Sequence, residues 1–596
     1  MLAYAMPPTY EVPPSGNLTD DVVEAVRERP ESVAFSRQVD GAWQDVTISE
    51  FADSVAAVAK GLIAAGVRPG DRVALLSKTR YEWTLIDYAI WWAGAATVPI
   101  YETSSAEQVR WILSDSEAVA CIVEDDSHVA RVNASRGELG DLSHVWSIEG
   151  DAVATLSALG GDVEDHELES RRTAVTPDSL ATLIYTSGTT GRPKGCCLTH
   201  GNFMFELGVA TTSLEELFDT EDAATLLFLP LAHVFARIIQ IGAIKSGARL
   251  GHTADVKDLL SSFAEFRPTF ILAVPRVFEK VFNSASQKAH SDGKGKIFDA
   301  AAETAIAYSR AQDTTKRTSP LLRAKHALFD RLVYAKLRAA LGGQARYAIA
   351  GGAPLGERLA HFFRGIGVPV LEGYGLTETT AAVTVNLPGQ TKIGTVGRPI
   401  PGTEVRVGAD GELLFRGGQI FTGYWKNDEA TAETLDADGW FHTGDVGEID
   451  EEGFVRITGR KKEILVTAGG KNVAPAVLED RIRAHALVSQ CMVVGDGKPF
   501  IAALVTIDEE AFAGWLDDHG KSGDVSKFTR DRDLLAEIQA AVDDANSQVS
   551  KAESIRKFQI LPDDWSEEAG HVTPTLKLKR NVVLRDFHDE VESLFF

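Results

Sequence analysis

An apolar run that leads into a small, flexible loop constrains this chain more than any other feature. Residues 180–185 are almost continuously apolar, and residues 186–195 then read TSGTTGRPKG. The pattern predicts a strand that ends in a turn, because glycines let the backbone bend sharply and bring N–H groups close to an anion. Hydroxyl groups and Lys194 add donors and positive charge. The loop is typical of a polyphosphate site, although its composition alone also fits an ordinary flexible turn.

Length and charge narrow the class of protein. A chain of 596 residues is too long for one core and implies several structural units. The formal net charge of -25 argues against nucleic acid as a partner, because phosphate backbones need a basic surface. The four cysteines show no C-x-x-C spacing, which fits a reducing compartment. No leader-like segment and no run of ~18 apolar residues is apparent, so we expect a cytoplasmic protein.

Alternating helix and strand signals predict an α/β fold. Residues 47–50 have the spacing of a capping box before a helical pattern over 51–65, and Gly66 is placed to end that helix. Strand and helix patterns then alternate through residue 123. Later strand candidates are continuously apolar, as expected for parallel strands covered on both faces. These candidates are residues 225–229, 270–274, 347–350 and 368–371.

Changes in the pattern of helix, strand and turn signals along the chain predict the domain organisation. We expect residues 1–17 to form a surface tail and residues 18–461 to form a large domain of layered α/β subdomains. Short strands and turns over about 400–458 predict a small β-rich subdomain within it. Residues 462–596 predict a small, mobile α+β domain, with Pro475 in the first turn of a helix that continues through Arg483.

A basic helical segment stands out against the acidic chain. Between residues 310 and 338, leucines and alanines at helical spacing are surrounded by lysines and arginines. An ordinary amphipathic helix with a solvated face explains this pattern, and peripheral contact with a membrane surface is the alternative hypothesis.

Further motifs extend the argument beyond the loop. The loop is neither a Walker A sequence nor a dinucleotide-binding fingerprint, because neither spacing occurs. It resembles instead the phosphate loop of the adenylate-forming superfamily, which comprises acyl-CoA synthetases, peptide-synthetase adenylation domains and luciferases. The other superfamily motifs follow in the same order, from about residue 47 to the C-terminus. They are residues 229–235, 351–355, 372–379, 440–445, 459–462 and 574–580.

The resemblance implies a site for ATP and Mg²⁺. Attack of a carboxylate on the α-phosphate brings two anions together, so donors and metal must offset their charge. Glu378 matches the family's metal carboxylate, with the Thr186 hydroxyl beside it. Tyr374 matches the residue that stacks on adenine, and Asp445 the acceptor for the ribose hydroxyls. The nucleotide-binding residues implied are Thr186, Ser187, Gly188, Thr189, Thr190, Gly191, Lys194, Gly351, Gly352, Ala353, Glu372, Gly373, Tyr374, Gly375, Thr377, Asp445, Arg460 and Lys577.

The same resemblance implies two alternating sites. Lys577 matches the lysine that reaches the reacting oxygens during adenylate formation, with Lys579 as the neighbouring alternative in register. His233 matches a ring that closes the acyl site and moves away for the thiol. Family members rotate the small domain about the residue that matches Lys462, which brings a loop containing Gly469 and Gly470 to a coenzyme A tunnel.

Three segments are most similar to the long-chain fatty acyl-CoA synthetase subgroup of bacterial type: residues 274–280, 464–475 and 573–577. The implied reaction is fatty acid, ATP and coenzyme A to acyl-CoA, AMP and diphosphate. A fatty acyl-AMP ligase that passes the acyl group to a carrier protein, a luciferase-type oxygenase and a non-catalytic nucleotide-binding scaffold remain as alternatives. The sequence leaves the oligomeric state open, with a homodimer as one alternative.

Overall fold

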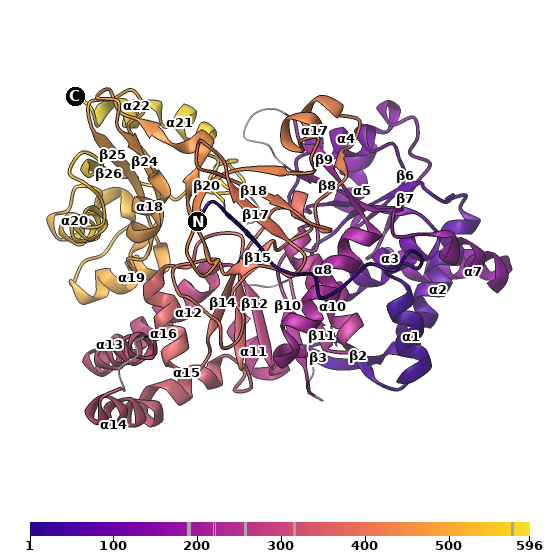
Figure 1. Ribbon diagram of the computed structural model, residues 1–596, viewed down its shortest axis with the longest axis horizontal. Helices are drawn as coiled ribbons and strands as arrows, with labels where there is room; N and C mark the ends of the chain where they lie inside the picture. The colour runs from indigo at the N-terminus through magenta and orange to yellow at the C-terminus, as the bar shows by residue number, and fades with distance from the viewer. Residues whose placement is uncertain (187–191, 219, 221, 255–258, 314–317, 574–576) are drawn as a thin grey trace.

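The computed structural model describes residues 1–186, 192–218, 220, 222–254, 259–313, 318–573 and 577–596. It divides into a large N-terminal body and a smaller C-terminal one, with a β-sheet between them (Figure 1). The mixed architecture confirms the predicted α/β class. No helix in these described ranges combines the length and the hydrophobicity that a membrane span requires.

Three sheets with many parallel pairs build most of the large domain. The first has seven strands in the order β19 (Gly423–Tyr424), β9 (Lys194–Thr199), β8 (Leu180–Thr186), β5 (Ala96–Ile100), β4 (Arg72–Leu76), β6 (Ala118–Val123) and β7 (His144–Ser147). The second runs β12 (Phe270–Ala273), β13 (Tyr347–Ala350), β14 (Val370–Tyr374), β15 (Thr384–Val385) and β16 (Arg398–Pro399). The third runs β10 (Ala224–Leu227), β11 (Arg249–His252), β2 (Val33–Val39) and β3 (Ala42–Thr47).

The helices of this body pack on these sheets. The predicted capping box forms, since Thr47 accepts from the Glu50 N–H and α2 begins at Ile48. Helices α3, α8 and α10 are buried along much of their length, which accounts for their lack of a polar face. The helices are α1 (Asp20–Glu28), α2 (Ile48–Ala64), α3 (Tyr81–Trp92), α4 (Ala106–Asp115), α5 (Asp126–Asn133), α6 (Ala152–Leu159), α7 (Asp165–Ala174), α8 (His200–Ser213), α9 (Glu215–Phe218), α10 (Val234–Ser246), α11 (Leu259–Phe266), α12 (Pro275–Ser291), α13 (Gly295–Gln312), α14 (Pro320–Phe329), α15 (Ala335–Ala340), α16 (Glu357–Gly365) and α17 (Asp428–Thr434).

The sheet between the two bodies contains a strand that sequence analysis assigned to a surface tail. Its order is β1 (Ala3–Ala5), β17 (Glu404–Val407), β18 (Glu412–Arg416), β20 (Phe441–Ile449) and β21 (Val455–Arg460). The N-terminal segment crosses the face of the molecule to reach β17 (Figure 1). The expected tail is therefore ordered where backbone pairing with β17 satisfies its N–H and C=O groups.

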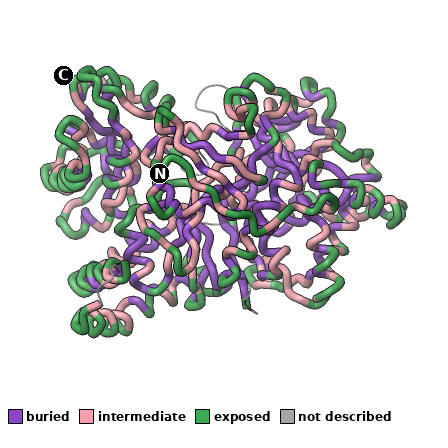
Figure 2. Tube along the Cα trace, in the orientation of Figure 1, coloured by how far each residue is buried: buried purple, intermediate pink, exposed green. Residues whose placement is uncertain are grey.

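The C-terminal body has its own apolar cores. A sheet of β24 (Val488–Val494), β25 (Ile501–Ile507) and β26 (Ile555–Ile560) packs against α18 (Pro475–Arg483), α19 (Glu509–Asp518) and α20 (Arg532–Asn546). A small hairpin, β22 (Leu465–Val466) and β23 (Asn472–Val473), precedes it, and α21 (Arg580–Asp586) and α22 (His588–Ser593) follow it. In both bodies the buried chain follows the sheets while exposed residues gather on outer helices (Figure 2).

Candidate active site

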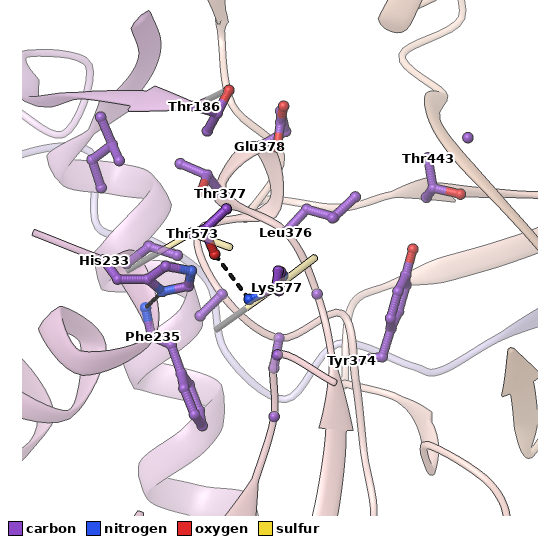
Figure 3. Close-up of a pocket in the computed structure, with 18 of the residues that line it drawn as sticks. Thr186, His233, Phe235, Tyr374, Leu376, Thr377, Glu378, Thr443, Thr573 and Lys577 are labelled. Atoms are coloured by element: carbon purple, nitrogen blue, oxygen red, sulfur yellow. Dashed lines mark hydrogen bonds between the residues drawn. The ribbon is translucent and has the colours of Figure 1, made fainter. Parts of the chain in front are cut away.

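One large cavity lies where the two bodies meet. Its volume is ≈ 2100 Å³, and it is lined by helices α8 and α10, by the carboxyl ends of β13 and β14, and by the segment around Lys577. Ligands in open α/β sheets bind outside the carboxyl ends of the strands, which is where this cavity opens. Figure 3 shows that Thr186, His233, Tyr374, Glu378 and Lys577 converge there from segments far apart in sequence.

The ends of the predicted phosphate loop face this cavity. Thr186 ends β8 and Lys194 begins β9, and the two residues pair directly across the antiparallel ladder. The Lys194 ammonium lies 5.1 Å from the centre of the Tyr424 ring. The predicted nucleotide-binding residues of the loop itself lie outside the described residues: Ser187, Gly188, Thr189, Thr190 and Gly191.

A hydrogen-bonded triad forms the predicted nucleotide side. The Tyr374 hydroxyl donates to Asp445 Oδ2 at 2.6 Å, and Arg460 Nε donates to Asp445 Oδ1 at 2.9 Å. Burial and the Asp445 carboxylate raise the pKa of Tyr374, so the phenol stays protonated. Asp445 is buried beneath Tyr374 and Arg460 rather than lining the cavity itself. Each carboxylate oxygen has a second lone pair, which leaves acceptor capacity for hydroxyl groups.

Glycines bring the backbone close at this side of the cavity. Gly351, Gly352, Gly373, Gly375 and Thr377 line it, as predicted. A Cβ on Gly351 would lie 3.1 Å from the Phe235 ring, and one on Gly375 only 1.4 Å from the Ala381 carbonyl oxygen. A side chain at Gly351 would therefore crowd Phe235, and a side chain at Gly375 would clash with the backbone at Ala381.

Two residues of the adenine motifs lie beside the cavity instead of in its wall, namely Ala353 and Glu372. The Leu355 N–H donates to Glu372 Oε1 at 3.0 Å, and burial raises the pKa of Glu372 to about 8. Glu372 is therefore largely a neutral carboxyl at pH 7, which suits a role in holding the 351–355 segment.

Glu378 and Thr186 present oxygen atoms on the same side of the cavity (Figure 3). Tyr424 donates its hydroxyl to Glu378 Oε1 at 2.8 Å, which leaves Oε2 for another partner. Among the described residues no group of three or more His, Cys, Asp or Glu side chains could hold a metal ion. One carboxylate and one hydroxyl fit Mg²⁺, which typically takes one or two protein oxygens and completes its shell with phosphates and water.

Lys577 enters from the C-terminal body. Its backbone N–H donates to Thr573 Oγ1 at 3.0 Å (Figure 3). The side chain lies in the cavity and stays accessible there, while the protein that surrounds the cavity lowers the pKa of Lys577 by desolvation. The Arg460 guanidinium lowers this pKa further, and the Asp445 and Glu378 carboxylates oppose the shift.

His233 lies opposite Lys577 at the start of α10 (Figure 3). Its Nδ1 accepts from the Phe235 N–H at 3.1 Å and so caps the helix. Burial, with the Lys577 charge as a smaller cause, lowers the pKa of His233 to about 3. The imidazole is therefore neutral at physiological pH. Its predicted gating movement stays a prediction.

The predicted hinge and coenzyme A tunnel residues lie near the junction of the two bodies. Lys462 lies in the 3₁₀ turn Lys461–Glu463, which connects β21 to the C-terminal hairpin, and it lines the cavity. Gly469 and Gly470 lie in the turn between β22 and β23 and do not line the cavity. The hinge and the coenzyme A tunnel stay predictions.

Sequence reasoning missed three contributors to this site. Tyr424 reaches Glu378 because β19 pairs with β9, more than 220 positions earlier, and no local motif indicated this pairing. Glu206 on α8 lines the cavity and accepts from the Ala382 N–H, and burial raises its pKa well above the usual range. The third is a buried ion pair, Arg237 with Asp87, below the start of α10.

Comparisons with known proteins agree with this geometry. Residues 22–425 match the AMP-binding enzyme family, and residues 462–596 match the AMP-binding enzyme C-terminal domain. The chain therefore belongs to the AMP-binding enzyme family, as predicted. A long-chain-fatty-acid--CoA ligase, FadD15 of Mycobacterium bovis, is 53% identical, with 100% of both chains covered.

Solved structures share the fold at lower identity. The A domain of a carboxylic acid reductase from Segniliparus rugosus, in complex with AMP and a co-purified carboxylic acid, has a TM-score of 0.75 at 22% identity. That comparison covers 97% of this chain and 94% of the other. The o-succinylbenzoate coenzyme A synthetase of Bacillus subtilis, in complex with ATP and magnesium ion, has a TM-score of 0.67 at 21% identity, covering 94% and 98%.

Proposed function

We propose that the chain is an AMP-forming long-chain fatty acid–CoA ligase. The observation that carries the proposal is a single cavity with two chemically different limbs that meet at Lys577. One limb is polar and contains Tyr374, Thr377 and Glu378. The other runs between α8 and α10 and is lined by Leu207, Leu214, Ile238 and other apolar side chains. An apolar acid that reacts at a nucleotide fits this arrangement.

The residues of the polar limb account for adenylate formation. A carboxylate oxygen attacks the α-phosphorus of ATP, and the bond to the bridging oxygen breaks as diphosphate leaves. Lys577, held at the junction of the limbs, would stabilise the negative charge that develops on the transferred oxygens. Lys194 and the Thr186 hydroxyl would contact the outgoing phosphates, and Tyr374 would support adenine.

Glu378 and Thr186 would hold Mg²⁺ through a carboxylate and a hydroxyl oxygen. The bound ion would neutralise phosphate charge. The Tyr424 hydroxyl, which donates to Glu378 Oε1, would help to hold this carboxylate in place beside the ion.

The second half-reaction needs a different arrangement of the two bodies. The acyl-adenylate is a mixed anhydride, so the coenzyme A thiol can attack its carbonyl while AMP leaves. Gly469 and Gly470 would line the thiol's approach after rotation about Lys462, which would also withdraw Lys577. The boundary at residue 462 would then separate a 1–461 body from a mobile 462–596 domain.

One assay tests the proposal. The protein is incubated with ATP, Mg²⁺ and a panel of fatty acids, with and without coenzyme A, and AMP, diphosphate and thioester are followed. We expect AMP and acyl-CoA to form together, in a coenzyme A-dependent manner, with palmitate-like acids.

Other outcomes identify the alternatives. Adenylate that accumulates and is discharged only by a carrier protein would identify a fatty acyl-AMP ligase. Oxygen-dependent light emission would identify a luciferase-type enzyme. Nucleotide binding without turnover of any acid would indicate a scaffold.

We further propose that α14 contacts an anionic lipid surface. Every residue of α14 is at least partly exposed, and three large apolar side chains protrude from α14 and the helical turn after it: Leu321 (73% exposed), Leu328 (55%) and Leu332 (48%). Exposed Lys325 and Arg331 flank them. Apolar residues with basic neighbours on an acidic protein favour a peripheral lipid contact. Lys316 and Arg317, which belong to the same basic region, lie outside the described residues.

Vesicle co-sedimentation tests this contact. We expect more protein on vesicles that contain phosphatidylglycerol than on neutral vesicles, and less binding after Leu328→Glu with Arg331→Gln. Unchanged partitioning of that variant would contradict the proposal. Arg110→Gln, which removes an exposed cation that pairs with Glu138, is the matched control.

A further inference from the structure

The apolar limb of the cavity follows one face of the β12–β13 pair. Side chains alternate along a strand, so Gly351, Ile349 and Tyr347 project to the same side. Gly351 and Ile349 line the cavity, as does Leu272, which is Ile349's partner on β12. At a rise of ~3.3 Å per residue, the path from Gly351 to Tyr347 is about 13 Å long. The limb therefore runs from the reaction centre toward the amino ends of these strands.

Residues of α8 and α9 form the opposite wall. Leu207 and Thr211 lie about one turn apart on α8, Leu214 follows the end of that helix, and Phe218 is the last residue of α9; all four line the cavity. The Thr211 hydroxyl donates to the Leu207 carbonyl at 2.9 Å, so it is already satisfied within α8. Gly242 on α10 faces this wall, since a Cβ there would lie 3.1 Å from Leu207 Cδ2. Apart from Glu206, Thr211 and Ser213, the residues that α8 and α10 contribute to the cavity wall are apolar.

The lining residue Phe218 makes an aromatic contact with the sheet. The Phe218 ring packs edge-on against Phe270, with the ring centres 5.3 Å apart. Phe270 pairs with Tyr347 across the β12–β13 ladder. The Tyr347 hydroxyl donates to Glu216 Oε2 at 2.6 Å, which ties α9 to the sheet at this point. Phe218 is buried, whereas Glu216 is exposed.

A second cavity begins directly behind this contact. It has a volume of ≈ 710 Å³ and is lined by Glu216, Thr220 and Tyr347 together with residues 343–346. Only one residue, Leu217, separates Phe218, in the first cavity, from Glu216, in the second. Likewise, only Ala348 separates Ile349 from Tyr347 along β13. The two cavities therefore approach each other along both α9 and β13.

We propose that Phe218 forms the end wall of the acyl channel and sets the longest chain that the enzyme accepts. The proposal rests on the proposed fatty acid ligase function. The terminal methyl of a full-length substrate contacts the Phe218 ring, and one more methylene has no space until that ring is removed. Without the ring, the channel joins the second cavity, and longer chains extend into it.

Three variants test this assignment. Phe218→Ala opens the wall, Phe218→Trp thickens it, and Leu217→Ala is the matched control. Leu217 is as deeply buried as Phe218 but lines neither cavity, so its truncation perturbs the same short helix without changing the channel. The kcat/KM values for acyl-CoA formation are measured with saturated acids from octanoic to hexacosanoic acid, and thermal unfolding confirms that each variant folds.

We expect Phe218→Ala to raise kcat/KM for the first acid beyond the wild-type limit by about tenfold or more, as hydrophobic pockets discriminate added methylenes. Phe218→Trp shortens the limit, and Leu217→Ala keeps the chain-length profile of wild type. A Phe218→Ala profile that coincides with those of wild type and Leu217→Ala would overturn the assignment. Failure of the wild type on every acid would overturn the proposed function instead.

Discussion

Lys577 places a positive charge where the substrate carboxylate and the α-phosphate of ATP must approach each other. It does not pair tightly with a carboxylate of the part of the protein that the structure describes. Among the described residues it has no ion pair within salt-bridge distance, although Asp445 and Glu378 act on it electrostatically. Desolvation lowers its pKa, so the free enzyme holds a cation that gains stability when phosphate arrives.

Lys577→Ala should therefore separate the two half-reactions. We expect ATP–diphosphate exchange with a fatty acid to fall about 10²–10³-fold, the range seen when one charge-stabilising donor is removed. Thioester formation from supplied acyl-adenylate should change little, because the proposed rotation about Lys462 would withdraw Lys577 in that step. Lys579→Ala is the control for the register of the motif, and a larger loss there would move the assignment to Lys579.

Glu372 gives the fold a calculable response to pH. Its pKa is raised to about 8 in the folded protein from an ordinary value of 4.5, so between these values the native state binds more protons than the unfolded chain. The stability that this difference contributes is fully present below pH 4.5 and is lost as pH rises through about 8.

Replacing Glu372 with Gln should therefore flatten this dependence. We expect the wild-type free energy of unfolding to decline more steeply than that of Glu372→Gln between pH 5 and pH 8, as measured by urea denaturation. Burial raises the pKa of Glu206 as well, in wild type and in the variant alike. Only the difference between their two stability curves therefore reports on Glu372. Parallel curves would show that Glu372 is ionised in the native state.

At the scale of elements, a buried polar network fixes the position of α10 and hence of His233. Arg237 and Asp87 are fully buried and pair with each other. Thr97 Oγ1 donates to Asp87 Oδ1 at 2.7 Å, and Gln240 Nε2 donates to Asp87 Oδ2 at 3.0 Å. Helices α3 and α10 are thus joined to β5 beneath the cavity.

Breaking this pair from one side should be costly. Asp87→Asn leaves a buried guanidinium uncompensated, so we expect a loss of about 3–5 kcal/mol in the free energy of unfolding. The double variant Asp87→Leu with Arg237→Met should recover part of that loss, because it removes both charges. Glu138→Gln, which breaks the exposed pair with Arg110, should cost at most about 1 kcal/mol. A similar small loss for Asp87→Asn would contradict the buried-charge argument.

Elements with local signals were predictable from sequence, and elements made by distant pairing were not. The capping box at Thr47 and the proline at the start of α18 each carry their own signature, and both form as predicted. The apolar strands β12 and β13 likewise follow from continuous burial.

The sequence did not predict the contacts that β19 makes. Tyr424 lies in a strand of only two residues, too short to carry a periodic pattern, and it meets Glu378 through pairing with β9. The motifs placed Tyr374, Glu378 and Lys577 in one site, but the bond from Tyr374 to Asp445 depends on side-chain geometry that spacing does not encode.

At the scale of the whole molecule, the two bodies touch through polar contacts beside the cavity. Arg276 on α12 donates to Asp508 at 2.7 Å, and Arg358 on α16 donates to the Ala484 carbonyl at 3.1 Å. Polar, partly exposed contacts of this kind favour domain movement over a fixed interface. The arrangement brings Lys577 to the nucleotide side and keeps Gly470 away from it.

Lys462→Pro tests whether this arrangement must change during turnover. Proline fixes one backbone dihedral at the proposed hinge. We expect ATP–diphosphate exchange to stay within about threefold of wild type while acyl-CoA formation falls at least tenfold, measured with the same fatty acid. Lys461→Pro, one position earlier in the same turn, shows whether the effect is specific to residue 462. Equal loss of both half-reactions would argue against the hinge.

The pairing of β1 with β17 also dictates an order of assembly. Ala3 lies opposite Arg406, so roughly the first two-thirds of the chain must be synthesised before β1 finds its partner. Contacts of such high sequence separation form late and slowly, since loop closure must precede them. During synthesis, the outer edge of β17 also emerges as an unpaired strand edge, which is prone to wrong pairing until β1 covers it. The β1 segment thus pairs late although it is synthesised about 400 residues before its partner.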